Sequence, residues 1–185
     1  MGNVANPRVW LGAEVFVAPV GTTAPTDVST ALNVAFKSLG LLSEDGPEDD
    51  YEQDSTDLFA QGPDSVLFVR TVTSKHKPTI KVVAVEDNKT VRALRFPGSS
   101  ASFTSGVTTT NKKAPTSDQR AFVIEQHDGT TIRRRVIPRG EVVERNTLQD
   151  APDDMAGVEF VIAEYFDANG VYEIELSNDA QQDPT

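Results

Sequence analysis

The stretch "DSVLFVRTVTSKHKPTIKVVAVE", residues 64–86, holds the two clearest strand patterns in the chain. Residues 64–74 and residues 79–86 are rich in β-branched and aromatic side chains, which favour strands. The "KHKP" between them, residues 75–78, ends in proline and is typical of a turn. We therefore predict a long β-hairpin that turns at residues 75–78, within a mainly β protein.

Strand patterns continue on both sides of this hairpin. Asp128-Gly129 stands between two strand-like runs, residues 120–126 and 131–138, and such a pair is a strong hairpin signal. A last hairpin is predicted from residues 158–167 and 171–177. The other predicted strands are residues 13–20, 33–43 and 140–149.

One short segment, residues 87–96, favours a helix. Asp87 or Asn88 can cap its start, and Val91 and Leu94 share one helical face. We predict a β-sandwich or half-barrel with this α-helix on its flank. The expected organisation is a single domain over residues 1–177, with an N-terminal arm at 1–8, long loops at 21–32, 44–64 and 98–118, and a flexible tail at 178–185.

Composition and charge exclude several classes of protein. The net charge is −11 and the pI about 4.6, which argues against a protein that grips the phosphates of nucleic acid. The chain has no cysteine, so disulfides and thiolate metal sites are excluded. The N-terminus lacks the pattern of a secretory signal, and no apolar run approaches the ~18 residues of a membrane span. We expect a soluble protein made in a cytoplasm, with no membrane partner.

Acidic residues concentrate in "SEDGPEDDYEQDSTD", residues 43–57, which holds eight of them and no basic residue. If this segment is a strand, four carboxylates share one face: Glu48, Asp50, Glu52 and Asp54. Such a row repels itself, so it is either a solvated loop or a wet, negative wall. A calcium loop is an alternative, but the order of an EF-hand is absent.

The clearest basic cluster is Arg133-Arg134-Arg135. On a strand, Arg133 and Arg135 share a face, and they either balance surface charge or meet acids of a neighbouring copy. His76 and His127 fall at predicted turns without a nucleophile beside them. No nucleotide loop or metalloprotease motif is present, so we predict no catalytic residue, no metal or cofactor site, and no enzyme.

Several short motifs occur in an order that resembles the major tail tube proteins of long-tailed, siphovirus-type bacteriophages, particularly those infecting actinobacteria. The motifs are Ser43-Glu44-Asp45-Gly46, Thr56-Asp57-Leu58, Gln61-Gly62, Val69-Arg70-Thr71 and Glu86-Asp87-Asn88-Lys89. Each is short, and the order carries the resemblance, which is strongest over residues 9–96. Pro47 and the "KHKP" depart from the family pattern.

The resemblance implies a structural protein of the virion tail, assembled in the host cytoplasm. Six copies would close into a ring, and stacked rings would form a tube around a tape-measure protein, with a tail terminator and tail-tip proteins as further partners. Viral DNA would pass through a lumen lined by the acidic row, without specific binding. The alternatives are another virion component, such as a tail terminator or decoration protein, and an extracellular carbohydrate-binding β-sandwich.

Overall fold

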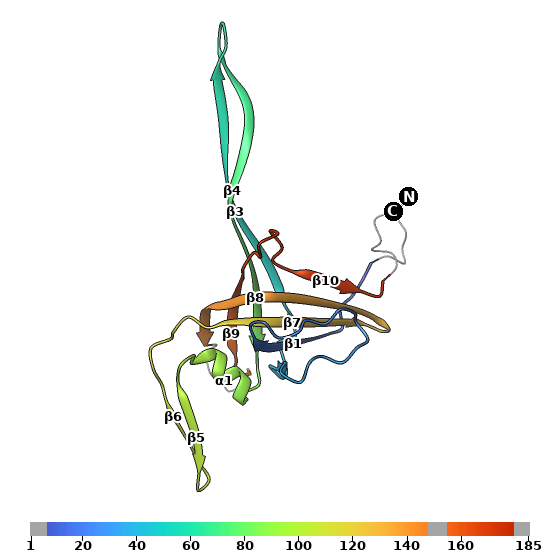
Figure 1. Cartoon of the computed structure of the whole chain (residues 1–185), viewed down its shortest axis with the longest axis vertical. Helices are drawn as coiled ribbons and strands as arrows, with labels where there is room; N and C mark the ends of the chain where they lie inside the picture. Colours follow the sequence, from blue (N-terminus) through green and yellow to red (C-terminus); the bar gives the residue numbers. More distant parts are fainter. Residues whose placement is uncertain (1–6, 148–154, 180–185) are drawn as a thin grey trace.

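The computed structural model describes residues 7–147 and 155–179, which form a mainly β structure with one short helix (Figure 1). The predicted fold class is thereby confirmed. The elements are β1 (Gly12–Pro19), β2 (Lys37–Ser38), β3 (Glu48–Gln61), β4 (Val66–Ala84), α1 (Lys89–Arg95), β5 (Ser100–Thr104), β6 (Val107–Asn111), β7 (Gln119–Asp128), β8 (Thr131–Thr147), β9 (Val158–Glu164) and β10 (Ile174–Ser177).

The main sheet is antiparallel and runs in the order β2-β1-β7-β8-β9-β4-β3, with β10 added to β8. Residues 37–43 connect its two ends: β2 pairs with β1, and Leu42 forms a bridge with Ala84 of β4. Gly40 makes this path possible, because its φ is +83° and the Glu86 carboxylate occupies the space that a Cβ would need. The sheet therefore curls into a partly closed barrel.

Strands β1 and β7 are apolar on both faces because both faces are buried. Val15 of β1 and Ile124 of β7 point into the main core inside the curled sheet, together with Ile80, Val82 and Phe160. Their neighbours Ala18 and Val123 point the other way, into a second core that Phe36 covers. Continuous runs such as "VFVA" and "AFVI" thus reflect a sheet packed on two sides.

Helix α1 closes the main core, as its sequence predicts. The Asn88 side chain caps it by accepting hydrogen bonds from the backbone N–H groups of Thr90 and Val91. Val91 and Leu94 are buried in the main core, so the apolar face of the short helix packs against the sheet.

The structure shows that the predicted hairpin at residues 64–86 does not turn at residues 75–78. Residues 66–84 form one continuous strand, β4, and its hairpin partner is β3, which occupies most of the expected loop 44–64. Pro78 is tolerated because β9 pairs with β4 only from Thr79 onward, so Pro78 has β3 as its only paired neighbour. The "KHKP" marks a register shift opposite Glu52 and Asp54, where Lys75 has a φ of 55°.

Two further strand assignments need correction. Residues 131–138 and 140–147 form the single strand β8, because a bulge opposite Arg120 and Phe122 absorbs Pro138 without ending the strand. Strand β10 pairs with β8 and not with β9, so the predicted last hairpin does not form. The hairpin at Asp128-Gly129 is confirmed. Of the predicted strand 33–43, only Lys37–Ser38 is a strand.

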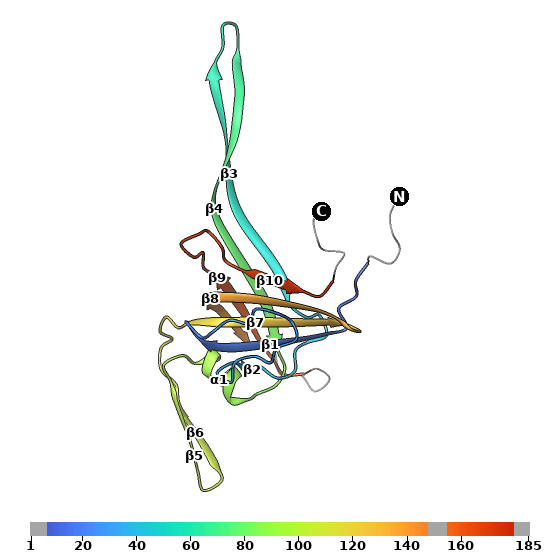
Figure 2. The same ribbon diagram turned by 45° about the vertical axis from the view of Figure 1, so that its right-hand side comes forward.

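Two hairpins leave the body in opposite directions along the longest axis (Figures 1 and 2). The outer part of the β3–β4 hairpin, residues 53–77, is called the long arm below. The β5–β6 hairpin lies within residues 98–118, which are therefore not one loop as expected. The expected arm 1–8, strand end 148–149 and tail 178–185 fall partly or wholly outside the described residues.

Candidate assembly surfaces

The tip of the long arm, residues 58–69, is apolar and exposed. Phe59 and Phe68 face each other across the hairpin with ring centroids 5.7 Å apart, and they are 60% and 58% exposed. The other large apolar side chains of the tip are Leu58, Val66, Leu67 and Val69. A two-stranded hairpin is at best marginally stable alone in water, and an apolar patch of this kind marks a contact site.

The acidic row lies on the arm and its root, in an exposed strand, as one of the two readings of the sequence predicts. It is not an unopposed wall, because lysines of β4 pair with three of its members. Lys81 pairs with Glu48, Lys77 lies 3.4 Å from Glu52, and Lys75 lies 2.6 Å from Asp54. Asp50 stands opposite Thr79. These exposed pairs hold the two strands in register but contribute little stability each.

Behind this row, a cluster centred on the buried Arg135 holds the arm root to the body. Arg135 of β8 donates to Asp49 of β3 at 2.7 Å and to Glu173 at 2.6 Å. Burial lowers the pKa of Arg135, but the hydrogen bonds that it donates to Glu173 and Asp49 outweigh burial and raise that pKa above its usual value. Glu164, at the end of β9, is 5% exposed, and its Oε2 has no partner among the described residues.

Glu164 should make stability depend on pH. Burial, with Glu173 and Asp49 nearby, raises its pKa to about 8, so the folded chain keeps a proton that the unfolded chain loses above about pH 4.5. Stability is therefore lost as pH rises toward 8, by up to about 1.4 kcal/mol per pH unit. Relative to the wild type, Glu164→Gln should gain about 2 kcal/mol between pH 5.5 and 8 in urea unfolding. If the stabilities of the wild type and of Glu164→Gln changed in parallel with pH, Glu164 would not carry the raised pKa.

The other arginines of the cluster also have partners within the chain. Arg133 donates to Gln126 at 2.6 Å and lies over the Trp10 ring, while Arg134 is buried and pairs with Glu125. Arg134 also donates to the backbone carbonyls of Asp27 and Thr30, so it fastens the loop 21–32 to the sheet. Contact of Arg133 and Arg135 with acids of a neighbouring copy stays a prediction.

A second basic region was not recognised in the sequence. Residues 87–113 carry Lys89, Arg92, Arg95, Lys112 and Lys113 against the single acid Asp87, a net charge of +4 in a chain of net charge −11. The signal was present as spaced single lysines and arginines, but only the fold brings α1 beside the β5–β6 hairpin. Lys112 and Arg95 both lie over the Phe96 ring, at 4.5 and 5.0 Å.

The two histidines lie away from any catalytic arrangement in the described part of the chain. His76 lies within β4 and not at a turn, where its Nδ1 is 2.8 Å from the Tyr51 hydroxyl. His127 ends β7, 3.9 Å from Glu125. Within the described ranges, no group of three His, Asp or Glu side chains is placed to hold a metal ion. Over the same ranges, no helix is long and apolar enough to cross a membrane.

A curled antiparallel sheet with a projecting, apolar two-stranded arm defines a β-rich protein with a large exposed apolar surface. The chain belongs to the phage tail tube protein family, whose model matches residues 3–179. A search of curated proteins found no match. The chain is therefore a structural component of a phage tail, one that assembles with copies of itself into a tube and associates with other tail components.

Proposed function

We propose that this chain forms hexameric rings that stack into the tail tube of a siphovirus-type phage, and that the tube conducts viral DNA. The observation that carries the proposal is the apolar tip of the long arm, which projects from the body with Phe59 and Phe68 exposed. A surface of this kind is covered when a neighbouring copy packs on it. Head-to-tail contacts between unlike surfaces generate rings when they close and filaments when they do not.

The edge of the main sheet supports the same proposal. Strand β3 pairs only with β4, so along its 14 residues one row of backbone groups has no strand beside it within the described chain. Proteins rarely leave so long an edge uncovered. In a ring, strands of neighbouring copies would cover these edges, and the joined sheets would form the wall of the channel.

The acidic row fits the lumen of such a channel. The four acids of the row, Glu48, Asp50, Glu52 and Asp54, lie on the arm and its root beside three pairing lysines, so this set of seven side chains has a net charge of −1. A lumen with a large positive field would bind phosphates and slow the passage of DNA. Paired charges with a slight negative excess would keep the wall hydrated without attracting the DNA.

Charge reversal tests this channel. Asp50→Lys with Asp54→Lys should leave tubes assembled, because both positions lie outside the apolar tip, but should reduce DNA delivery at least tenfold by adding phosphate contacts to the lumen. Plating efficiency and potassium efflux from infected cells measure delivery. The matched control is Glu44→Lys with Glu144→Lys, which makes the same charge change on the body. Normal delivery by the lumen variant would show that the row faces elsewhere.

The remaining partners follow from the tube. A tape-measure protein would fill the lumen before DNA, and a tail terminator and tail-tip proteins would cap the two ends, with assembly in the host cytoplasm. Rotational averaging of end-on views of purified tubes tests the ring, and sixfold symmetry is the expected result. Arg133, which is partly exposed, is proposed to meet acids of the adjacent copy, and a contact map of the ring would show this directly. The sequence predicts the same role for Arg135, but its guanidinium is buried on Asp49 and Glu173 of its own chain.

A further inference from the structure

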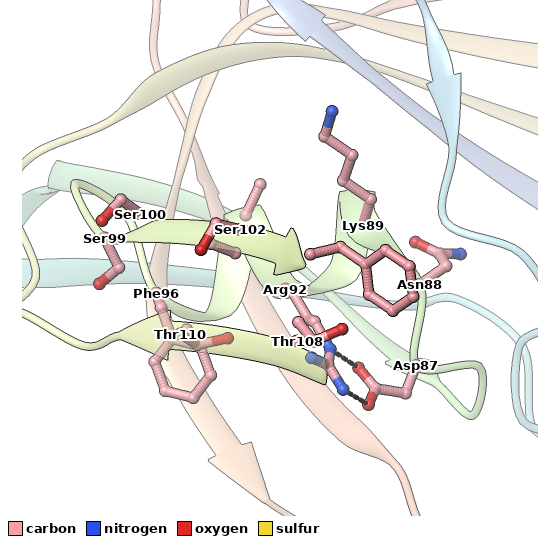
Figure 3. Close-up of a pocket in the computed structure, with 13 residues that line it drawn as sticks. Asp87, Asn88, Lys89, Arg92, Phe96, Ser99, Ser100, Ser102, Thr108 and Thr110 are labelled. Atoms are coloured by element: carbon pink, nitrogen blue, oxygen red, sulfur yellow. Dashed lines mark hydrogen bonds and ion pairs between the residues drawn. The ribbon is translucent and has the colours of Figure 1, made fainter. Parts of the chain in front are cut away.

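A cavity lies between α1 and the β5–β6 hairpin, at the end of the molecule opposite the arm tip (Figures 1 and 3). Its volume is about 640 Å³, within the range of pockets that bury a drug-sized ligand. Lys89 and Arg92 line it from the helix, and Ser102, Thr108 and Thr110 line it from the hairpin. The site is thus formed by two elements that meet only in the folded chain.

The lining of this cavity is partly apolar. Phe96 and Phe103 contribute aromatic rings, and Phe103 is 73% exposed. Val107, near the turn of the same hairpin, is 62% exposed. Exposed aromatic and aliphatic side chains around a concave site favour an apolar, aromatic occupant.

Charge favours the arm as that occupant. Lys89 and Arg92 line the cavity against the single acid Asp87, with which Arg92 pairs at 2.5 Å, and Lys112 lies over the Phe96 ring. The arm tip, residues 58–69, carries Asp64 and no basic residue, and Asp57 directly precedes it. The arm tip therefore combines aromatic side chains with negative charge, which complements both properties of the cavity.

Geometry excludes a contact within one chain. The arm tip and the β5–β6 hairpin lie at opposite ends of the longest axis, and both views agree on this (Figures 1 and 2). A second copy, displaced along that axis, brings its cavity toward the arm tip of the first. Each copy then offers one tip and one cavity, which is the condition for an open head-to-tail stack.

We propose that the apolar arm tip of one copy, with Phe59 and Phe68, seats in the cavity between α1 and the β5–β6 hairpin of the next copy along the tube. This inference rests on the proposed tube and deepens it, because it names the two surfaces that join successive copies. It also gives the basic region a role: Lys89 lines the seat and Lys112 lies over its Phe96 ring, where both would meet Asp57 and Asp64 of the arm.

Cysteine cross-linking tests the seat, because the chain has no cysteine of its own. The double variant Phe68→Cys with Phe103→Cys, assembled and treated with a short bismaleimide, should give a ladder of covalent dimers, trimers and longer multimers. Phe68→Cys with Val34→Cys is the matched control, because Val34 is 81% exposed on the body, and it should give no ladder. Dimers from Phe68→Cys alone would show that tips meet tips and would overturn the seat.

The outcomes separate this inference from the function beneath it. Tubes that are visible by electron microscopy but give no ladder would overturn the seat and leave the tube standing. Absence of tubes in the wild-type protein would overturn both the seat and the proposed tube.

A second measurement avoids substitutions at the seat. Carbodiimide cross-linking of wild-type tubes should join Asp57 or Asp64 to Lys89, Lys112 or Lys113 of another copy. Mass spectrometry that finds the arm aspartates joined only to other lysines would overturn the seat.

Discussion

Phe68→Asp should abolish tube assembly while the subunit stays folded. The side chain lies at the tip of the long arm, is more than half exposed, and meets Phe59 edge to face. A carboxylate there would have to be buried without a partner when the tip packs on another copy, which costs several kcal/mol at each contact. Because each contact repeats along the tube, assembly fails as a whole. Electron microscopy and sedimentation of the purified variant measure this.

Two controls show that the effect comes from the tip. Phe68→Leu keeps an apolar side chain and should still form tubes, and Val34→Asp places the same charge at another exposed apolar position. The subunit carrying Phe68→Asp should lose only about 1 kcal/mol of stability, since it gives up one exposed aromatic pair. Normal tubes formed by Phe68→Asp would show that the arm tip is not an assembly contact.

Arg135→Met should destabilise the folded subunit by about 3–5 kcal/mol. The guanidinium is the positive charge that pairs with Asp49 and Glu173, and Glu164 lies close by. Methionine keeps the length of the side chain but leaves the largely buried Glu173 carboxylate, with Asp49 and Glu164 nearby, without a positive partner. For a chain of this size the loss corresponds to a fall of roughly 10 °C in Tm, which calorimetry measures at neutral pH.

Acid should relieve part of this defect, because protonation removes the repulsion that the missing arginine leaves behind. The Arg135→Met variant should therefore recover stability relative to the wild type as pH falls from 7 toward 4. Arg70→Met is the matched control, because Arg70 is exposed on the arm, and it should change stability by less than about 0.5 kcal/mol. Equal stability of the two variants would contradict a structural role for the Arg135 cluster.

Local signals in the sequence predicted local structure correctly. Asp128-Gly129 turns a hairpin because glycine accepts the positive φ of 61° that this turn requires, whatever surrounds it. Asn88 caps α1 by bonds to the next turn of its own chain. The mainly β class followed from the same kind of short-range pattern, and the order of motifs pointed to the family that residues 3–179 match.

The incorrect strand predictions have two causes: prolines that lie inside strands, and strand pairings that no local pattern shows. Pro78 and Pro138 resembled the ends of strands, yet each lies inside one, since the first has a single paired neighbour and the second occupies a bulge. Strand β10 joins β8 because of where the sheet leaves an open edge, which no local pattern shows. The lysines opposite the acidic row lie about 20 to 35 residues away in the chain, so only the register of β3 and β4 reveals the pairs.

The candidate assembly surfaces were harder to predict than the fold. The acidic row was recognised because its members alternate within one short strand. The apolar tip falls partly in an expected loop and partly in an expected strand, and its exposure could not be predicted because an exposed apolar strand has the same sequence pattern as a buried one. The cavity beside α1 depends on two elements that only folding brings together, so its basic character was missed.

A cryo-electron-microscopy reconstruction of the tube formed by the full chain tests the central claim most directly. We expect sixfold rings whose lumen carries the β3 acids, with Phe59 and Phe68 of each copy buried against another copy. A purified chain that stays monomeric at high concentration, or a tube in which the arm tip projects freely into solvent, would contradict the account.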